Sequence, residues 1–287
     1  MRPRPLPPPA ARTTLLEHLL AAGAGMKRTR AKELLRAGLL RVNGEPATRH
    51  DHPLAPGDRV EVADAAIPAR RDLPFPVLHE DEHMIAIDKP SGLLTIGTPG
   101  EKTRTAYALL NRALAASRER AFIVHRLDRE TSGVLLLAKS EKAKDALMSR
   151  WQEARKLYLA VVEGTPRPAE QRLVHFLRED ERLRVRAHDN PVHNSKRASL
   201  AFRVARAGRV HALLEVELET GRKNQIRAQL EAIGHPIAGD AKHGARTNPC
   251  GRLCLHAARL SVPHPATGER LVLESPAPGE FEALARG

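Results

Sequence analysis

Apolar positions follow two different periods along the chain, and the helical one appears first, near the start. Leucines recur with helical spacing over residues 15–20, directly after Thr13 and Thr14, and either threonine can accept the hydrogen bond that caps a helix. A second helix is expected from Thr29, ending at Gly38, because glycine commonly ends a helix. These segments predict a small domain that begins with two helices.

Two strands complete this small domain. A strand-like run precedes Asn43 and Gly44, a pair that favours tight hairpin turns because both residues tolerate a positive φ. A Pro-Gly-Asp turn at 56–58 leads into a second strand at 59–62. We therefore expect residues 13–63 to fold as one unit.

From residue 77 onward, strand-like and helix-like segments alternate without long gaps. The strand-like segments are 84–87, 134–138, 157–162 and 210–218, and the helix-like segments are 103–114, 140–154 and 224–233. This order predicts a mixed α/β domain around one large sheet, covering residues 77–287.

Proline-rich stretches flank the small domain. Residues 1–12 are basic and proline-rich, so we expect a disordered tail, and they lack the apolar core of a secretion signal. Residues 64–76 contain Pro68, Pro74 and Pro76 and are expected to form a linker. No apolar run approaches the length that spans a membrane, so a cytoplasmic protein is expected.

The formal net charge of +13 creates a positive field that attracts phosphate backbones, although a basic surface can also serve solubility alone. Basic side chains concentrate in one short run of the small domain, with Glu33 as its one acid. They are Lys27, Arg28, Arg30, Lys32, Arg36 and Arg41. Such a run is often simply a solvated helix face, and it is also the pattern of an RNA-binding helix.

Neither metal nor cofactor is called for by the sequence. Cys250, Cys254 and His256 lie close together but lack a fourth ligand, which makes a structural zinc site a poor interpretation. There is no H-E-x-x-H, no phosphate-binding P-loop and no G-x-G-x-x-G motif. We expect no cofactor and no metal.

One loop carries the most informative chemistry. Residues 125–133 read H-R-L-D-R-E-T-S-G and place the carboxylate of Asp128 between the cations Arg126 and Arg129. A lone aspartate between strands is usually a turn residue, so the chemistry alone makes this loop only a candidate site. The segment closely resembles the catalytic signature of RluA-type pseudouridine synthases, enzymes that isomerise uridine in structured RNA.

Further segments resemble that family in the same order, over most of residues 78–265. They are E-D-E-H-M-I-A-I-D-K-P-S-G from Glu80, R-K-L-Y from Arg155, T-G-R-K-N-Q-I-R from Thr220, I-G-H-P-I from Ile233 with G-D at 239–240, and R-L-C-L-H-A from Arg252. The small domain is similar to the αL RNA-binding motif of ribosomal protein S4. Together the resemblances imply a mixed, largely antiparallel sheet in the catalytic domain, preceded by an RNA-binding module.

The resemblance assigns the essential role to Asp128. Its carboxylate could attack the anomeric carbon of the ribose or remove the neighbouring proton to give a glycal, and the sequence leaves both routes open. A carboxylate in a partly dry pocket stays charged only beside a cation, and the resemblance implies that Arg227 is its ion-pair partner. Without the resemblance, Arg227 would be a solvated helix arginine.

The resemblance gives further side chains a place around the substrate. Tyr158 is expected to stack on the uracil and to exchange a proton late in the reaction, where a core tyrosine is the alternative. Arg126 is expected to fill the space that the extruded nucleotide leaves, where a phosphate contact is the alternative. His125 is expected to order the loop. The remaining substrate contacts are Thr131, Arg222 and Gln225.

Two positions depart from the family pattern. Asn224 lies where the third signature usually has histidine, and His243 lies where an aromatic residue commonly follows G-D. Neither has an expected part in bond making, so both bear on how the RNA is positioned.

We therefore predict an RNA pseudouridine synthase, an isomerase that acts on large-subunit ribosomal RNA, with transfer RNA as the second choice. A ribosome-assembly factor that binds RNA without catalysis explains the charge equally well, but does not require Asp128, Tyr158 and Arg227 together. A carbohydrate hydrolase would need two separated carboxylates, and Asp128 and Glu130 are too close in sequence. The expected partner is RNA, with no membrane, and the chain is expected to be a monomer.

Overall fold

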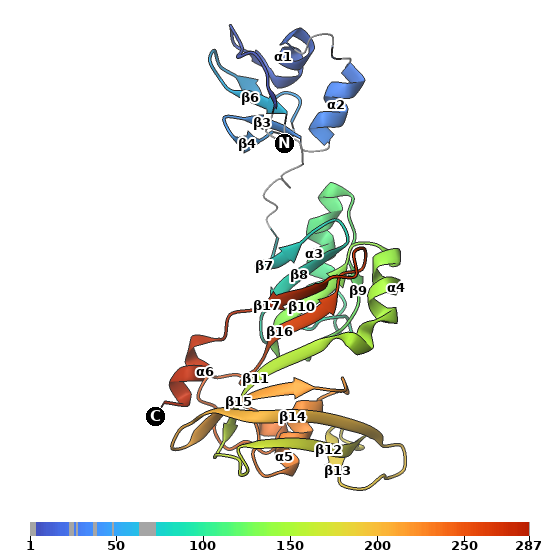
Figure 1. Ribbon diagram of the computed structural model, residues 1–287, viewed down its shortest axis with the longest axis vertical. Helices are drawn as coiled ribbons and strands as arrows, with labels where there is room; N and C mark the ends of the chain where they lie inside the picture. The colour runs from blue at the N-terminus through green and yellow to red at the C-terminus, as the bar shows by residue number, and fades with distance from the viewer. Residues whose placement is uncertain are drawn as a thin grey trace. The chain divides into compact units, whose positions relative to one another are not determined.

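The computed structural model describes residues 4–22, 26, 28–36, 39–47, 49–62 and 73–286. The chain divides into two compact units, Met1–Asp72 and Leu73–Gly287 (Figure 1). Most of the predicted linker, residues 64–72, lies outside the described residues. Its last part was wrongly assigned, because Phe75 is buried in the core of the second unit.

The described part of the first unit contains two short helices, a four-stranded sheet and a two-stranded sheet. Its elements are β1 (Arg4–Pro5), β2 (Thr13–Thr14), α1 (Leu15–Ala22), α2 (Arg28–Arg36), β3 (Leu40–Val42), β4 (Glu45–Pro46), β5 (Pro53–Leu54) and β6 (Val60–Val62). One sheet has the order β1-β6-β3-β4, and β2 pairs with β5. The apolar sides of both helices and of β3 and β6 form its core.

The predicted cap of the first helix is present. The Thr14 hydroxyl accepts from the backbone N–H of Glu17 at 3.4 Å, and the Glu17 carboxylate accepts from the backbone N–H of Thr14 at 3.0 Å. This reciprocal pair satisfies two amides at the helix start. The predicted turn is also present, with φ of 53° at Asn43 and 88° at Gly44.

The predicted disordered tail is wrong for the described part of residues 1–12. Arg4 and Pro5 pair with β6, and the backbone N–H of Leu6 donates to Val60 O at 2.8 Å. Pro9 is buried and accepts from the backbone N–H of Gly57. An edge strand tolerates proline because a missing N–H on its outer side breaks no ladder bond.

The second unit is built on one mixed sheet of eleven strands. Its strands are β7 (Val77–Glu80), β8 (Met84–Lys89), β9 (Phe122–Ile123), β10 (Ser132–Ala138), β11 (Arg155–Glu163), β12 (Glu170–Glu179), β13 (Val185–His188), β14 (Lys196–Ala207), β15 (His211–Leu218), β16 (Leu255–Pro263) and β17 (Arg270–Glu274). Its helices are α3 (Ala106–Leu114), α4 (Glu141–Ser149), α5 (Gln225–Ala232) and α6 (Gly279–Leu284), with 3₁₀ turns at Ala115–Ser117, Trp151–Glu153 and Ala241–His243.

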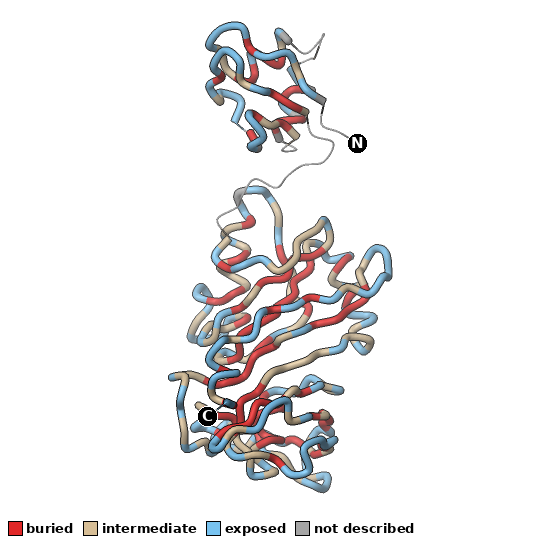
Figure 2. Tube along the Cα trace, turned by 60° about the vertical axis from the view of Figure 1, so that its left-hand side comes forward, coloured by how far each residue is buried: buried red, intermediate tan, exposed pale blue. Residues whose placement is uncertain are grey.

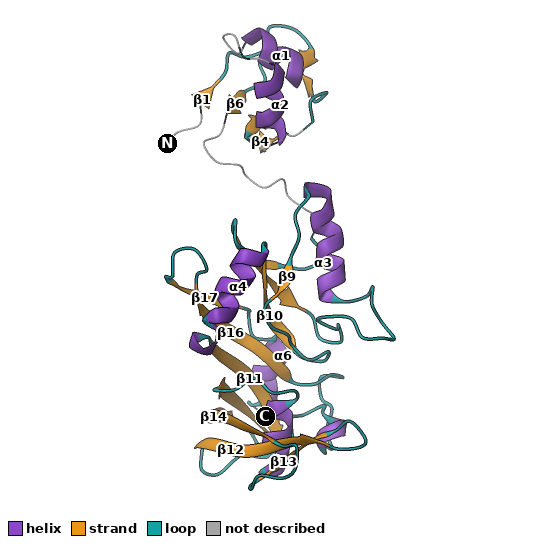
Figure 3. Ribbon diagram, turned by 90° about the vertical axis from the view of Figure 1, so that its right-hand side faces the viewer, coloured by secondary structure: helices purple, strands orange, loops and turns teal. Residues whose placement is uncertain are grey.

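The strand order confirms the predicted fold class. It runs β13-β12-β14-β15-β11-β16-β10-β8-β7, with β17 added to β16 and β9 to β10. All of these pairings are antiparallel except β10 with β16. Every residue of β10 is buried, because helices cover both of its faces. Figure 2 shows this buried run along the central strands, and Figure 3 shows α3 and α4 on opposite sides of β10.

The single parallel pairing depends on a glycine. Gly133 has a φ of 111°, and a Cβ built on it would lie 2.3 Å from the carbonyl oxygen of Ala257. Any other residue would therefore push β10 and β16 apart. The neighbouring Ser132 hydroxyl lies 2.9 Å from Nδ1 of His256, in the paired strand. These contacts fix the end of the candidate catalytic loop at the middle of the sheet.

Candidate active site

The candidate catalytic loop connects β9 to β10 and is held by its backbone. The Thr95 hydroxyl donates to the carbonyl oxygen of Leu127 at 2.7 Å and accepts from its N–H at 3.1 Å. The Ser91 hydroxyl donates to the carbonyl oxygen of Glu130 at 2.5 Å. The residues on both sides of Asp128 are thus fixed by the segment that follows β8.

Lys89, at the end of β8, strengthens the same attachment. Its ammonium group is fully buried and donates to the carbonyl oxygens of Pro90, Leu93 and Arg129 at 2.8, 2.8 and 3.2 Å. Burial lowers the pKa of Lys89 to about 8, against the attraction of nearby carboxylates. Lys89 lies in a segment that resembles the family, but it was not among the predicted site residues. The sequence signal for its burial was a lysine at the end of an apolar strand, because lysine is seldom fully buried without partners.

The predicted catalytic and substrate-binding side chains line one cavity of about 440 Å³. They are Asp128, Tyr158, Arg227, Arg126, His125, Thr131, Arg222 and Gln225. The catalytic loop, β11 and the start of α5 supply them, although they are up to about a hundred residues apart in the chain. The cavity falls in the usual size range of small-molecule sites.

Asp128 is half-buried and lines this cavity. Burial raises the pKa of its carboxyl group, and the nearby cations of Arg227 and Arg126 act in the opposite direction. Among the residues that the structure describes, none donates a hydrogen bond to this carboxylate. The carboxylate is therefore poised in a partly dry, positive environment, with its oxygens available to a ligand.

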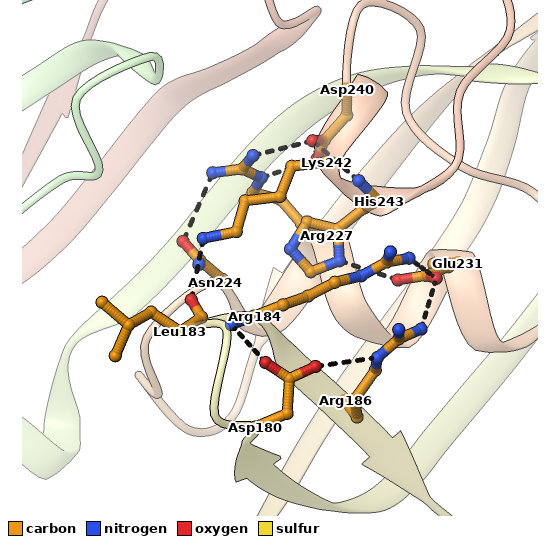
Figure 4. Close-up of polar contacts among 10 residues, drawn as sticks. All are labelled: Asp180, Leu183, Arg184, Arg186, Asn224, Arg227, Glu231, Asp240, Lys242 and His243. Atoms are coloured by element: carbon orange, nitrogen blue, oxygen red, sulfur yellow. Dashed lines mark hydrogen bonds and ion pairs between the residues drawn. The ribbon is translucent and has the colours of Figure 1, made fainter.

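Arg227 does not form the predicted direct ion pair with Asp128. Its guanidinium is buried and binds both carboxylate oxygens of Asp240, through Nε at 2.6 Å and Nη2 at 2.7 Å. Its Nη1 donates to Asn224 at 3.3 Å (Figure 4). The same nitrogen lies 3.7 Å from the carboxylate of Glu130. The G-D aspartate is the nearer partner, so Arg227 affects Asp128 through its field. The alternative of a solvated helix arginine is also wrong.

Tyr158 lies on β11 beside the carboxylate. A bulge in the pairing of β11 with β16 falls between Leu157 and Tyr158, and such bulges redirect side chains near functional sites. Burial, and secondarily the charge of Asp128, raises the pKa of the Tyr158 phenol. Its hydroxyl therefore stays protonated in the free protein.

His125, which was predicted to order the loop, contacts both β10 and Trp151. Its Nε2 accepts from the backbone N–H of Leu136 at 2.9 Å, which puts its proton on Nδ1. Its ring stacks on Trp151 with centroids 5.1 Å apart. Burial, helped by the charge of Lys156, lowers the pKa of His125 to about 3. The His125 ring is neutral near neutral pH and its Nε2 already accepts a hydrogen bond, so it is poorly suited to transfer protons.

Trp151 and Lys156 were not predicted as site residues, although both line the cavity. The Lys156 ammonium lies 5.0 Å from the centre of the Trp151 ring. The helix expected over residues 140–154 would have included Trp151, but α4 ends at Ser149. Trp151 instead lies in a 3₁₀ turn after α4, between the core and the cavity.

The remaining predicted contacts have different surroundings. Gln225 is buried and both ends of its amide are hydrogen-bonded: its oxygen accepts from the Thr220 hydroxyl and the Arg222 N–H, and its nitrogen donates to Ser199 O. Gln225 therefore shapes the loop before α5. Arg126 and Arg222 are exposed residues of the cavity lining, and Thr131 is a buried one.

The two departures from the family pattern lie side by side with Arg227. Asn224 has a φ of 50° and accepts from the Arg227 guanidinium. His243 is buried, and its Nδ1 lies 2.8 Å from the carboxylate of Glu231. Asp240 accepts from the backbone N–H of His243, which links the two groups.

A second cavity of about 450 Å³ adjoins the first on the other side of the catalytic loop. Asp128, Arg126 and Arg227 line both cavities, and Lys242 lies at the edge of the second. Among the described residues, no group of three or more His, Cys, Asp or Glu side chains is placed to hold a metal ion. None of the described helices is long and apolar enough to cross a bilayer.

The predicted RNA-binding cations of the first unit are described only in part. Arg28 and Lys32 are exposed on α2, and Arg41 on β3 is half-buried. Lys27 and the side chains of Arg30 and Arg36 lie outside the described residues.

Comparison with known families gives this arrangement its context. The family described as RNA pseudouridylate synthase matches residues 83–232, and the S4 domain family matches residues 16–60. The chain belongs to the RNA pseudouridylate synthase family. Its matched range contains Asp128, Tyr158 and Arg227, and the S4 match covers the predicted RNA-binding helix.

Relatives in this synthase family include bacterial proteins that carry one name. The chain is 37% identical to "Ribosomal large subunit pseudouridine synthase D" of Nitrosomonas europaea, over 74% of this chain and 64% of that protein. It is 32% identical to the protein of the same name from Neisseria meningitidis serogroup A, over 90% of this chain and 74% of that one. The chain thus spans just under two thirds of the Nitrosomonas protein.

Solved structures support the fold. "Human RNA Pseudouridylate Synthase Domain Containing 4" is similar with a TM-score of 0.59 at 24% identity, covering 72% of this chain and 90% of that one. "Human RNA Pseudouridylate Synthase Domain Containing 1" is similar with a TM-score of 0.61 at 21% identity, covering 71% and 84%. At these identities the likeness establishes the synthase fold alone.

Proposed function

We propose that this protein isomerises uridine to pseudouridine in large-subunit ribosomal RNA, with Asp128 as the group that acts on the ribose. The observation that carries the proposal is a half-buried carboxylate, free of hydrogen bonds from described residues, in a cavity that also holds Tyr158 and Arg227. Family membership supports the reaction type.

The reaction breaks the bond between N1 of uracil and C1′ of ribose and rejoins the sugar to C5. In one route the Asp128 carboxylate attacks C1′, uracil leaves as the anion, turns, and displaces the carboxylate through C5. In the other route Asp128 removes the proton on C2′ as uracil leaves C1′ as the anion, and C5 of the turned uracil then bonds to C1′ of the glycal while Asp128 returns the proton to C2′. Both routes end with loss of the C5 proton and its replacement on N1, so all atoms are conserved. Both begin from ionised Asp128.

The cations around Asp128 support its ionised form. Arg227 is held in place by Asp240, so its charge is fixed before the substrate binds. A fixed charge needs no reorganisation when charge develops on the sugar or the departing uracil. Tyr158 offers a protonated phenol beside the base, which suits stacking and proton delivery better than proton removal in the free enzyme.

Access to the ribose requires extrusion of the target nucleotide. Unstacking a base costs a few kcal/mol. Arg126, which is exposed at the rim of both cavities, would fill the space that the nucleotide leaves. A phosphate contact by the same side chain would lower the energy of the complex without helping extrusion.

The choice of ribosomal RNA rests on the names of the bacterial relatives and on the S4 match. We propose that the first unit holds flanking RNA in the cytoplasm through phosphate contacts of α2, including those of Arg28 and Lys32.

The substrate proposal is tested by incubating the full chain with unmodified bacterial large-subunit ribosomal RNA transcripts and, separately, with transfer RNA transcripts. Pseudouridine is then mapped by carbodiimide-induced stops in primer extension. We expect stops at one or a few uridines of the ribosomal transcript. Stops in transfer RNA alone would move the substrate to that class, and an absence of stops in both would overturn the proposal.

A further inference from the structure

The tip of the β12–β13 hairpin carries a residue that local structure disfavours. Leu183 has a φ of 57°, and its side chain is 65% exposed. The turn is closed by hydrogen bonds from the backbone N–H of Leu183 to Asp180 O at 2.9 Å and from that of Asp180 to Arg184 O at 2.8 Å. This is the three-residue hairpin loop in which glycine or asparagine usually takes the left-handed position.

Neither packing nor backbone preference explains leucine at this position. A left-handed backbone costs a leucine free energy that glycine avoids. Burial could repay that cost, but the side chain extends away from the neighbouring polar network (Figure 4). A residue that breaks a local rule without a compensating contact is a candidate for contact with another molecule.

The hairpin lies against the edges of both cavities. Lys242, on the edge of the second cavity, donates from Nζ to Leu183 O at 2.7 Å. Lys223, on the edge of the first cavity, pairs with Glu179 at the end of β12. The hairpin therefore contacts residues that line both cavities.

A chain of charged groups also connects the hairpin to Arg227. Arg184 pairs with Glu231, and the other oxygen of Glu231 lies 2.8 Å from His243 (Figure 4). His243 donates its backbone N–H to Asp240, the partner of Arg227. The hairpin is thus fixed relative to the site before RNA binds.

The charge around the tip is positive once its internal pairs are removed. Glu179, Asp180 and Glu231 are each neutralised by a cation within the protein. Among the described residues, Arg178 and Arg182 have no ion-pair partner, and both are exposed. Together with Lys242 they outnumber the one acid left there, Glu181. An exposed apolar side chain among free cations matches a base flanked by phosphates.

We propose that the β12–β13 hairpin is an RNA-binding element that packs Leu183 against a base next to the target uridine. This inference rests on the proposed function, because extrusion of the target leaves the neighbouring bases unstacked. The apolar side chain covers such a base, as apolar wedges do in other nucleic-acid complexes. Arg182 and Lys242 contact the adjoining phosphates.

The test uses Leu183→Gly and Leu183→Asn in the full chain, because both residues accept the left-handed backbone and keep the turn. The probe is the unmodified bacterial large-subunit ribosomal RNA transcript. We expect KM for the transcript to rise about 5-fold or more, because both variants lose the apolar area that the leucine side chain buries against the base. We also expect kcat to change less than 2-fold and the thermal midpoint to stay equal or rise. Leu183→Met should restore a KM near that of the wild type.

Val210→Asn is the matched control. Val210 is 58% exposed at the connection between β14 and β15 and lines neither cavity. Its KM should equal that of the wild type. A wild-type protein that forms no pseudouridine would overturn the proposed function. An active wild type whose Leu183 variants keep a normal KM, with or without a change in thermal midpoint, would overturn the hairpin proposal alone.

Discussion

Arg227 and Asp240 form a buried, two-point ion pair, with 2.6 Å between Nε and Oδ2 and 2.7 Å between Nη2 and Oδ1. Bidentate geometry fixes both the position and the plane of the guanidinium. The remaining nitrogen, Nη1, is directed to Asn224 and Glu130. Asp240 therefore positions the cation that acts on Asp128, although it has no expected contact with substrate.

Replacing Asp240 tests this positioning role. Asp240→Asn leaves a buried guanidinium without its counter-charge, which should cost about 3 kcal/mol of unfolding free energy. We also expect kcat to fall at least 10-fold while KM for RNA changes little. Chemical denaturation and single-turnover kinetics measure the two effects. Glu274→Gln, which breaks the exposed pair with Arg259, should cost less than about 1 kcal/mol and leave kcat intact.

The pH dependence of catalysis should follow the carboxyl group of Asp128. Burial raises its pKa, and the ionised form is the active one, so kcat/KM should fall as the pH drops through this raised value. Arg126 lowers that pKa, so Arg126→Ala should move the acid limb to higher pH. The exposed Arg155, substituted by Ala, is the control. Identical acid limbs in Arg126→Ala and the wild type would argue against an electrostatic effect of Arg126.

The same shift predicts a stability change at the active site. Because the folded-state pKa of Asp128 is raised, the folded protein binds this proton more tightly than the unfolded chain does. Stability is therefore lost as pH rises from the ordinary carboxyl pKa through the raised one, and the loss is complete above it. Asp128→Asn should unfold at a higher temperature than the wild type at pH 7.5. The two proteins should unfold at the same temperature at a pH low enough to protonate Asp128 in both the folded protein and the unfolded chain. Calorimetry at pH 7.5 and at the acidic pH gives the unfolding temperatures of both proteins.

The first unit should contribute salt-dependent affinity. Arg28→Ala combined with Lys32→Ala removes two exposed cations of α2, so the slope of log Kd against log salt should fall by about 1 per lost phosphate contact. At saturating RNA, kcat should be unchanged. Filter binding at several salt concentrations gives the slopes, and Arg286→Ala, in the second unit, is the control. A slope equal to that of the wild type would contradict the proposal that α2 holds flanking RNA through phosphate contacts.

Local signals made much of this fold predictable. Thr14 and Ser140 precede helices because both side chains cap them, and the glycine-containing turn after β3 needed a positive φ. The apolar run at 134–138 indicated a strand, and β10 is a strand that is buried on both faces. The motifs around Asp128, Tyr158 and Arg227 placed these side chains at one cavity, because resemblance supplied the long-range topology that periodicity lacks.

Interactions between distant segments were not predictable from local patterns. The bond between Arg227 and Asp240 crosses from α5 to the following loop, and nothing in the spacing distinguishes Asp240 from Asp128 as the partner. The pairing of Arg4 with β6 depends on an open strand edge that composition does not show. The left-handed backbone of Leu183 was hidden because leucine gives no turn signal.

The account depends most directly on the carboxylate of Asp128. Asp128→Asn keeps the size of the side chain and removes its charge, so we expect no detectable pseudouridine when this variant is incubated with unmodified large-subunit ribosomal RNA. RNA binding should remain close to that of the wild type, measured by filter binding on the same transcript. Wild-type amounts of pseudouridine from Asp128→Asn would contradict the central claim.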